Sequence, residues 1–121
     1  MYEITINEQV YSFNFGMGFL REMNKLVKTT ADGSKLEQNI GFRYYLADMI
    51  DGNPEALVTI LNVANKGQSP RVTMHLLDSY IDDPETDIDK IYEDLLGFFK
   101  SANSTKRVTT QMLTALKLTE A

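Results

Sequence analysis

Two glycines separated by one residue, Gly16 and Gly18, lie between an expected strand and an expected helix. A Gly-x-Gly turn in this place can hold a phosphate group, because glycine lets backbone N–H groups approach a ligand closely. The dinucleotide-binding pattern needs a third glycine, and that position is Arg21. The Gly-Lys-Ser/Thr triplet of a Walker loop is also absent from the sequence. We therefore expect the two glycines to serve backbone geometry, since glycine permits positive φ and a sharp change of direction.

Acidic residues gather between Asp78 and Asp94, where the sequence has eight acids and one lysine. Five of them fall at positions 1, 3, 5, 7 and 12 of a calcium-binding loop, namely Asp83, Glu85, Asp87, Asp89 and Asp94. The glycine required at position 6 is Ile88, and Pro84 stiffens the start of the segment. We expect a solvated acidic patch in which Thr86 or Asp87 caps a helix.

Residue types that perform catalysis are scarce. His75 is the only histidine and there is no cysteine, so a zinc site would lack ligands. A Ser-His-Asp arrangement assembles in space and is not visible in a sequence. However, His75 falls inside an expected helix, and no exposed-nucleophile turn accompanies it. We expect a protein that is not an enzyme, with no cofactor and no metal, and with His75 on a helix surface or partly buried.

Composition favours one domain over residues 1–121, since 43% of the residues are hydrophobic and can form a core. The formal charge of −5 repels the phosphate backbone of nucleic acids unless basic residues cluster. No apolar stretch approaches the roughly 18 to 20 residues of a membrane span, and the N-terminus lacks a signal-peptide pattern. We expect a cytoplasmic protein that binds neither nucleic acid nor membranes.

Periodicity in the sequence predicts an α+β fold, mostly α. Alternating apolar residues predict strands over 2–6 and 10–15, joined into a hairpin by a short polar link. Such a hairpin is marginally stable alone, so it must pack on the helices that follow. We expect a short N-terminal β-hairpin (1–15) packed on a bundle of four to five helices (17–101), with a loosely specified tail or helix over 102–121.

Apolar residues at helical spacing, together with turn residues, set the expected helix limits. Gly52 and Gly67 suit helix ends, and Asn53 and Ser69 suit N-caps before a proline. The segment after residue 101 is threonine-rich and lacks a strong cap, so we expect it to be helical only if it docks. The helices are expected over about residues 18–28, 36–51, 54–65, 70–81 and 88–101.

Aromatic residues occur as two adjacent pairs, Tyr44–Tyr45 and Phe98–Phe99. Neighbouring residues on a helix point about 100° apart. Either one member of each pair is exposed as an interface element, or both members are buried between neighbouring helices. The sequence leaves these alternatives open.

The opening stretch YEITINEQVYSFNFGMGFLRE resembles the tail assembly chaperones of long-tailed, siphovirus-type bacteriophages and prophages of Gram-positive bacteria. This resemblance covers residues 1 to about 28, and the rest of the chain is similar in size and helical character. The residues that carry it are Phe13, Phe15, Gly16, Gly18, Phe19, Leu20, Arg21 and Glu22.

The resemblance implies a chaperone that binds the long helical tape measure protein before the tail tube forms, and that helps to recruit tube subunits. Such proteins are not enzymes and are absent from the mature virion, and a longer frameshifted form often accompanies them. Contact residues would then be exposed apolar positions at amphipathic spacing. These are Tyr44, Tyr45, Phe98, Phe99, Met112, Leu113 and Leu116.

Other classes of function remain as alternatives. The segment SPRVTMHLLDSY could form the recognition helix of a small transcriptional regulator, but it has one arginine and is followed by acids. Another phage protein-interaction module and an enzyme with an unrecognised site are further alternatives. The sequence does not decide whether the chain forms homo-oligomers.

Overall fold

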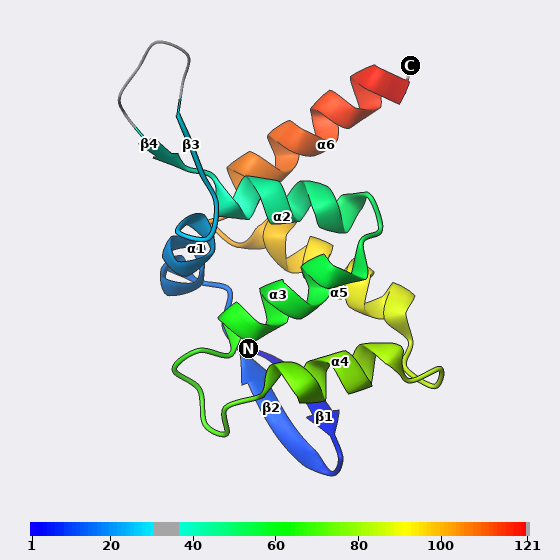
Figure 1. Ribbon diagram of the computed structural model, residues 1–121. Helices are drawn as coiled ribbons and strands as arrows, with labels where there is room; N and C mark the ends of the chain where they lie inside the picture. Colours follow the sequence, from blue (N-terminus) through cyan, green and yellow to red (C-terminus); the bar gives the residue numbers. More distant parts are fainter. Residues whose placement is uncertain (31–36, 121) are drawn as a thin grey trace.

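The computed structural model describes residues 1–30 and 37–120, without the side chains of residues 118–120. The fold is α+β and mostly α, as predicted (Figure 1). In chain order the elements are β1 (Tyr2–Ile6), β2 (Gln9–Phe13), α1 (Met17–Asn24), β3 (Lys28–Thr30), β4 (Glu37–Asn39), α2 (Gly41–Ile50), α3 (Pro54–Ala64), α4 (Met74–Asp82), α5 (Ile88–Ser101) and α6 (Lys106–Glu120).

The N-terminal hairpin has a single apolar face. Strands β1 and β2 pair antiparallel, with Tyr2 opposite Phe13 and Ile4 opposite Tyr11. Directly opposite residues lie on the same side of a sheet, so the apolar rows of the two strands form one surface. The turn uses Asn7 at φ +52° and Glu8 at φ +68°. Strand β2 ends at Phe13, two residues before the predicted end, and Phe15 enters the core from the following loop.

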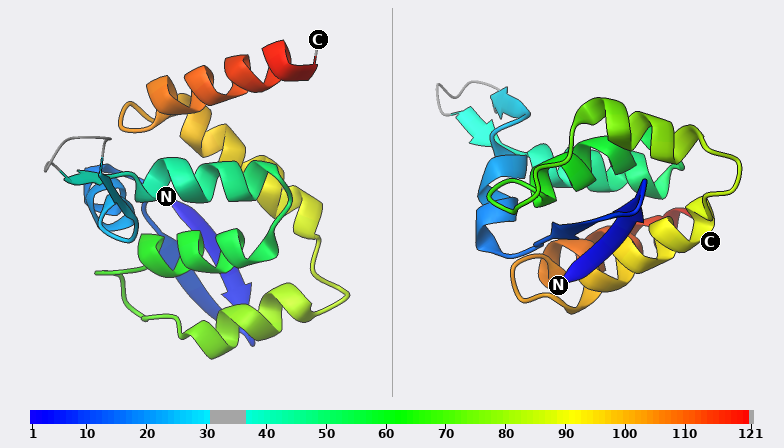
Figure 2. Two further views of the ribbon diagram at one scale, coloured as in Figure 1. Left: turned by 45° about the horizontal axis from the view of Figure 1, so that its top comes forward. Right: turned by 90° about the horizontal axis from the view of Figure 1, so that it is seen from below.

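This apolar face packs on helices, as predicted. Helices α2, α3 and α4 form one layer, and the hairpin and α5 lie side by side against it (Figure 2). The Asn14 N–H donates to the Ala64 carbonyl at 2.9 Å. The Tyr2 hydroxyl donates to Asp94 of α5 at 3.1 Å. The hairpin is therefore fixed to α3 and α5 by polar contacts as well as by burial.

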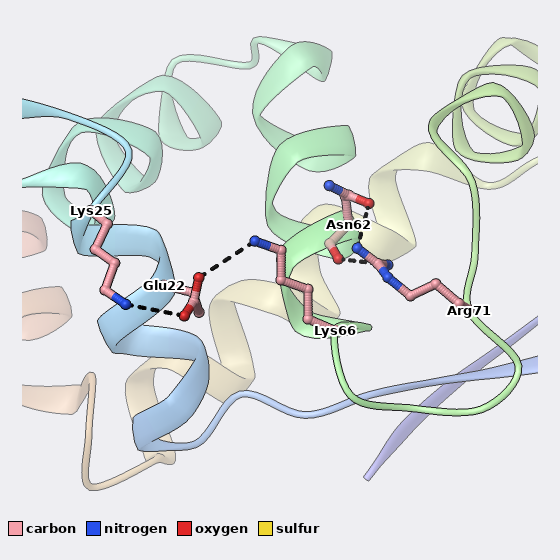
Figure 3. A network of polar contacts seen from close by, with 5 residues as sticks. All are labelled: Glu22, Lys25, Asn62, Lys66 and Arg71. Atoms are coloured by element: carbon pink, nitrogen blue, oxygen red, sulfur yellow. Dashed lines mark hydrogen bonds and ion pairs between the residues drawn. The ribbon is translucent and has the colours of Figure 1, made fainter.

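Asn65, which is completely buried, joins the hairpin to α3 and to the segment before α4. Its amide nitrogen donates to the Ser12 carbonyl at 2.9 Å. Its amide oxygen accepts from the Val72 N–H at 2.6 Å and from Arg71 at 2.8 Å. Arg71 also reaches Asn62 of α3 (Figure 3). Because the buried Asn65 side chain is satisfied only when these partners are in place, it specifies one arrangement of three segments.

The hydrogen bonds of Asn65 explain why the fourth helix begins later than predicted. Helix α4 begins at Met74 rather than at residue 70, and its N-cap is Thr73, whose hydroxyl accepts from the Leu76 N–H at 3.1 Å. The predicted cap Ser69 is wrong, because Asn65 holds the backbone of Val72 out of the helix. The third and fifth helices follow local signals more closely. Asn53 and Asp87 accept from backbone N–H groups at their N-termini, and α5 has the predicted limits.

A second hairpin, β3–β4, replaces the ends of two predicted helices. Residue 28 was expected in the first helix and residues 37–39 in the second, but these segments pair antiparallel. All six strand residues are exposed and polar, so neither segment has an apolar stripe to bury as a helix. Part of the expected break, residues 31–35, and the expected helix start at 36 lie outside the described residues. Helix α2 begins at Gly41, where Asn24 Oδ1 accepts from the Phe42 N–H at 3.0 Å.

The positions at which the backbone requires glycine are not the predicted pair, Gly16 and Gly18. Gly52 and Gly67 have φ of +87° and +82° and end their helices as expected. Gly16, in contrast, has φ −83° at the N-cap of α1, and Gly18 lies within that helix, so neither adopts the positive φ that glycine permits. The tightest contact is at Gly41, where a Cβ atom would overlap the Met23 carbonyl oxygen. Gly41 thus allows α2 to start directly against α1.

We predict opposite effects for alanine at two glycines. Gly41→Ala forces α1 and α2 apart and lowers the free energy of unfolding by about 2 kcal/mol. Gly97 lies inside α5 with open space around it, so Gly97→Ala raises the free energy of unfolding by about 0.5–1 kcal/mol through helix propensity. Urea denaturation of both variants measures the difference. If both variants changed the free energy of unfolding by the same amount and in the same direction, α1 and α2 would not approach each other as closely at Gly41 as described.

Candidate protein-binding groove

Three helices enclose an apolar groove of about 580 Å³. Met49 and Ile50 come from the end of α2, Tyr92 and Leu96 from α5, and Leu113 from α6. Gly52, Asp89 and Glu93 complete its lining. Grooves between helices that are apolar inside and polar at the edge are typical of sites that receive an amphipathic helix.

The wall supplied by α5 is a second face of that helix. Ile91, Leu95 and Phe99 point into the core and are almost fully buried. Tyr92 and Leu96 each follow a core residue by one position, and they are separated from each other by four. Residues four apart share a helix face, so α5 presents one apolar stripe to the core and another to the groove.

The wall supplied by α6 is anchored at the start of that helix. The Thr105 hydroxyl donates to the Phe99 carbonyl at 2.9 Å, and Arg43 of α2 donates to Gln111 at 3.3 Å. Val108 and Met112 pack against the core. The C-terminal half of α6 points away from the rest of the fold (Figure 1). The tail expected to be helical on docking is therefore helical and docks by its first half.

Thr109 is the exception in this anchor. Its side chain is completely buried, and its hydroxyl has no hydrogen-bond partner among the described residues. A buried hydroxyl without a partner costs free energy that a methyl group of the same shape would not. The packing of α6 on the rest of the fold is thus weakened at Thr109.

Negative charge lies along the α5 side of the groove, where Asp89 and Glu93 are exposed. Burial first, and the charge of Asp89 second, raise the pKa of Tyr92 above its ordinary value. Lys90 points to a different partner, Asp94, at 2.8 Å, and this ion pair lowers the pKa of Asp94. The groove therefore has an apolar floor and an acidic edge.

The structure separates the predicted contact residues on α2 from this groove. Tyr44 is 50% exposed on the outer side of α2. Its ring stands edge-on against Tyr45 at 5.1 Å, and Tyr45 is half-buried against the core. The first of the open alternatives holds for this pair, because one member is exposed.

The predicted pair on α5 is divided between core and surface. Phe99 is completely buried, so the expectation that it is exposed is wrong. Its ring fills the space between Phe15 and Phe42, at 5.6 and 5.1 Å. Phe98 is half-buried and stacks near Phe15 and Tyr2. It lines two hollows of about 480 and 330 Å³ on the hairpin side of α5 and not the three-helix groove.

The predicted residues on α6 have three different positions. Met112 packs against the core, Leu113 lines the groove, and Leu116 lies half-exposed one turn further along. Sequence reasoning thus placed Leu113 in the contact set and missed its neighbours Met49, Ile50, Tyr92 and Leu96. The four-residue spacing of Tyr92 and Leu96, offset from the core stripe of α5, is the signal that could have found two of them.

The Gly-x-Gly segment lines a separate hollow of about 430 Å³. Glu22 lines the same hollow, between Lys25 and Lys66 at 3.3 and 3.4 Å (Figure 3). These ammonium groups, Lys25 first, lower the pKa of Glu22 and keep it ionised. A charged carboxylate in this position disfavours a bound phosphate.

Other sequence candidates lie apart from one another. Among the described residues, no three acidic or histidine side chains converge closely enough to hold a metal ion. His75 is exposed on α4, as one of the predicted placements had it. Helix α4 carries no lysine or arginine, which disfavours its use as a recognition helix on DNA. Within the described part of the chain, no helix is both long and apolar enough to cross a membrane.

Comparison with known protein families identifies the family of this chain. The family described as "phage tail assembly chaperone protein, TAC" matches residues 3–113. The chain belongs to this family of phage tail assembly chaperones. No curated protein and no solved structure is significantly similar to it. The match extends well beyond the N-terminal segment that carries the resemblance in the sequence, and it includes α2, α5 and the first half of α6.

For a tail assembly chaperone, a groove that can receive a helix is the feature of greatest interest. The family role implies contacts with other phage tail proteins. Binding another protein requires an accessible apolar surface with a shape that the partner can fill. The groove between α2, α5 and α6, at about 580 Å³, offers more space than the apolar hollow beside Tyr2, Phe15 and Phe98, at about 330 Å³.

We predict that two threonines in the anchor of α6 respond oppositely to valine. Thr109→Val removes an unpaired buried hydroxyl and raises the free energy of unfolding by about 1 kcal/mol. Thr105→Val leaves the Phe99 carbonyl without its partner and lowers that free energy by about 1–2 kcal/mol. Urea denaturation monitored by far-UV circular dichroism measures both. A loss of stability in Thr109→Val would show that its hydroxyl has a partner after all.

Proposed function

We propose that this chaperone binds an apolar helical segment of the tape measure protein in the groove between α2, α5 and α6. Membership of the tail assembly chaperone family supports a role with tail proteins. The groove supports a helical client, because helices with apolar residues at i, i+3, i+4 and i+7 fit such surfaces. A bound segment is kept from aggregating through its apolar stripe until the tail assembles.

The observation that carries this proposal is the second apolar stripe of α5. Tyr92 and Leu96 pack against the edge of the core, whereas Ile91, Leu95 and Phe99 lie fully inside it. They remain partly accessible beside Leu113. Accessible apolar side chains gathered at one groove are typical of a binding site rather than of an ordinary surface.

The family assignment also supports a wider role as part of this proposal. The client would be a tape measure protein of a long-tailed, siphovirus-type phage or prophage of Gram-positive bacteria, and tail tube subunits would be recruited to the complex. The chaperone would act by binding and not by catalysis. It would work in the host cytoplasm before the tail is complete, and it would be absent from the mature virion. The predicted contacts at Tyr44, Tyr45, Phe98, Met112 and Leu116 remain proposals for secondary contacts around Leu113.

Co-expression with the neighbouring tape measure protein tests this proposal. We predict that the wild-type chain increases the soluble fraction of the tape measure protein and co-purifies with it. The variant Leu96→Ala/Leu113→Ala truncates both sides of the groove and should raise the dissociation constant about thirty- to a thousandfold, because buried interface anchors contribute about 1–2 kcal/mol each.

A matched variant controls for the loss of apolar surface in general. Val10 and Met74 are 44% and 46% exposed and lie on β2 and α4, away from the groove. Val10→Ala/Met74→Ala should bind like the wild type. If the wild-type chain formed no complex with the tape measure protein, the proposal would be wrong. If the two double variants bound equally well, the binding site would lie outside the groove.

A further inference from the structure

Unbalanced negative charge surrounds one end of the three-helix groove. Asp89 and Glu93 are exposed on α5, four residues apart, and both line the groove. The C-terminus of α2 ends at the same place, since Ile50 and Gly52 are also lining residues. The carbonyl groups at the end of a helix carry partial negative charge. The last turn of α2 has no basic residue, and the acidic Asp51 follows it.

The nearby cations leave this charge largely uncompensated. Lys90 is bonded to Asp94 at 2.8 Å, and Asp94 lies with Tyr2 on the hairpin side of α5. Among the described residues, no ion pair includes Asp51, Asp89 or Glu93. Lys117 follows Leu113 by one turn of α6 and is the basic residue nearest to the groove along that helix. The bond to Asp94 first, and the charges of Asp87 and Glu93 after it, raise the pKa of Lys90, so Lys90 offsets part of the charge of Glu93. An excess of negative charge remains at Asp51 and Asp89, neither of which forms an ion pair among the described residues.

We propose that the groove selects an amphipathic helix whose apolar stripe is flanked by lysine or arginine. This inference rests on the proposed function and narrows it to the chemistry of the client. The apolar stripe of the client fills the space among Met49, Leu96 and Leu113, and its basic residues lie against Asp89 and Glu93.

Charge complementarity of this kind controls which helix binds. Carboxylates four residues apart on α5 match cations three or four residues apart on a client helix. A client flanked by glutamate or aspartate places like charges together, which is strongly unfavourable. Because the carboxylates are exposed, their effect is on specificity and association rate, and salt reduces it. The net charge of −5 attracts a basic helix over longer distances as well.

Two synthetic peptides test the selection directly. They share a leucine stripe at helical spacing and differ only in their flanking residues, which are lysine in one and glutamate in the other. Binding to the full chain is measured by fluorescence anisotropy at 50 mM and 500 mM salt. We expect the lysine peptide to bind at least tenfold more tightly at low salt, and the ratio to fall towards one at high salt.

Charge variants assign this preference to the groove. Asp89→Lys/Glu93→Lys should reverse the preference, so that the glutamate peptide binds more tightly. Glu3→Lys/Asp78→Lys makes the same change in net charge at exposed positions on β1 and α4 and should keep the preference for lysine. Because Asp89 supports the first turn of α5, the milder Asp89→Asn/Glu93→Gln and its control Glu3→Gln/Asp78→Asn repeat the test without added positive charge. The milder groove variant should abolish the preference.

The results separate this inference from the proposed function. Equal binding of both peptides by the wild type, with weaker binding by Leu96→Ala/Leu113→Ala, would overturn the charge selection and leave the groove as the site. Absence of binding by both peptides would also overturn it, and the co-purification experiment would then decide the proposed function alone. If the charge variants changed only the sedimentation of the chain by itself, a second copy would be the occupant and the inference would be wrong.

Discussion

Contact among four phenylalanine rings holds the parts of this chaperone in place. Phe15 follows the N-terminal hairpin, and Phe19, Phe42 and Phe99 come from α1, α2 and α5. The ring of Phe99 lies 5.6, 5.9 and 5.1 Å from the other three. Edge-on and stacked aromatic contacts at these separations add to the stabilisation from burial alone. Each ring is at least about nine-tenths buried, so the cluster determines how α5 is rotated against its neighbours.

The rotation of α5 in turn determines what the surface offers. With Ile91, Leu95 and Phe99 turned inward, Tyr92 and Leu96 face the groove and Phe98 faces the hairpin. Phe99 also holds α6, the third wall of the groove, because its carbonyl accepts a hydrogen bond from Thr105 just before that helix. Ring packing in the core therefore positions α2 and α5. Helix α6 is positioned by the Thr105–Phe99 bond together with the hydrogen bond between Arg43 and Gln111. A preformed groove lowers the entropy lost when a partner binds.

Local signals predicted much of the fold, and tertiary contacts decided the rest. The limits of α5 and the capping role of Asn53 depend on neighbouring residues alone and were predicted correctly, and Asp87 was one of two predicted caps for α5. The start of α4 depends on Asn65, whose bonds to Val72 and Ser12 join distant segments. Whether Phe98 or Phe99 faces the core depends on the rotation of α5, which amphipathic spacing leaves open for adjacent aromatic residues. Of the groove, Leu113 was predicted, while Met49 and Ile50 were not, because the juxtaposition of α2 and α6 has no signal in the spacing of either helix.

We propose that a helix from another tail protein occupies the groove between α2, α5 and α6. Amide hydrogen exchange of the chain, alone and in complex with its tape measure protein, detects where such a helix binds. We expect slower exchange over residues 46–50, 89–96 and 109–116 in the complex, with little change in the hairpin and in α4. Protection confined to the hairpin, to α1 or to the outer side of α4 would contradict it.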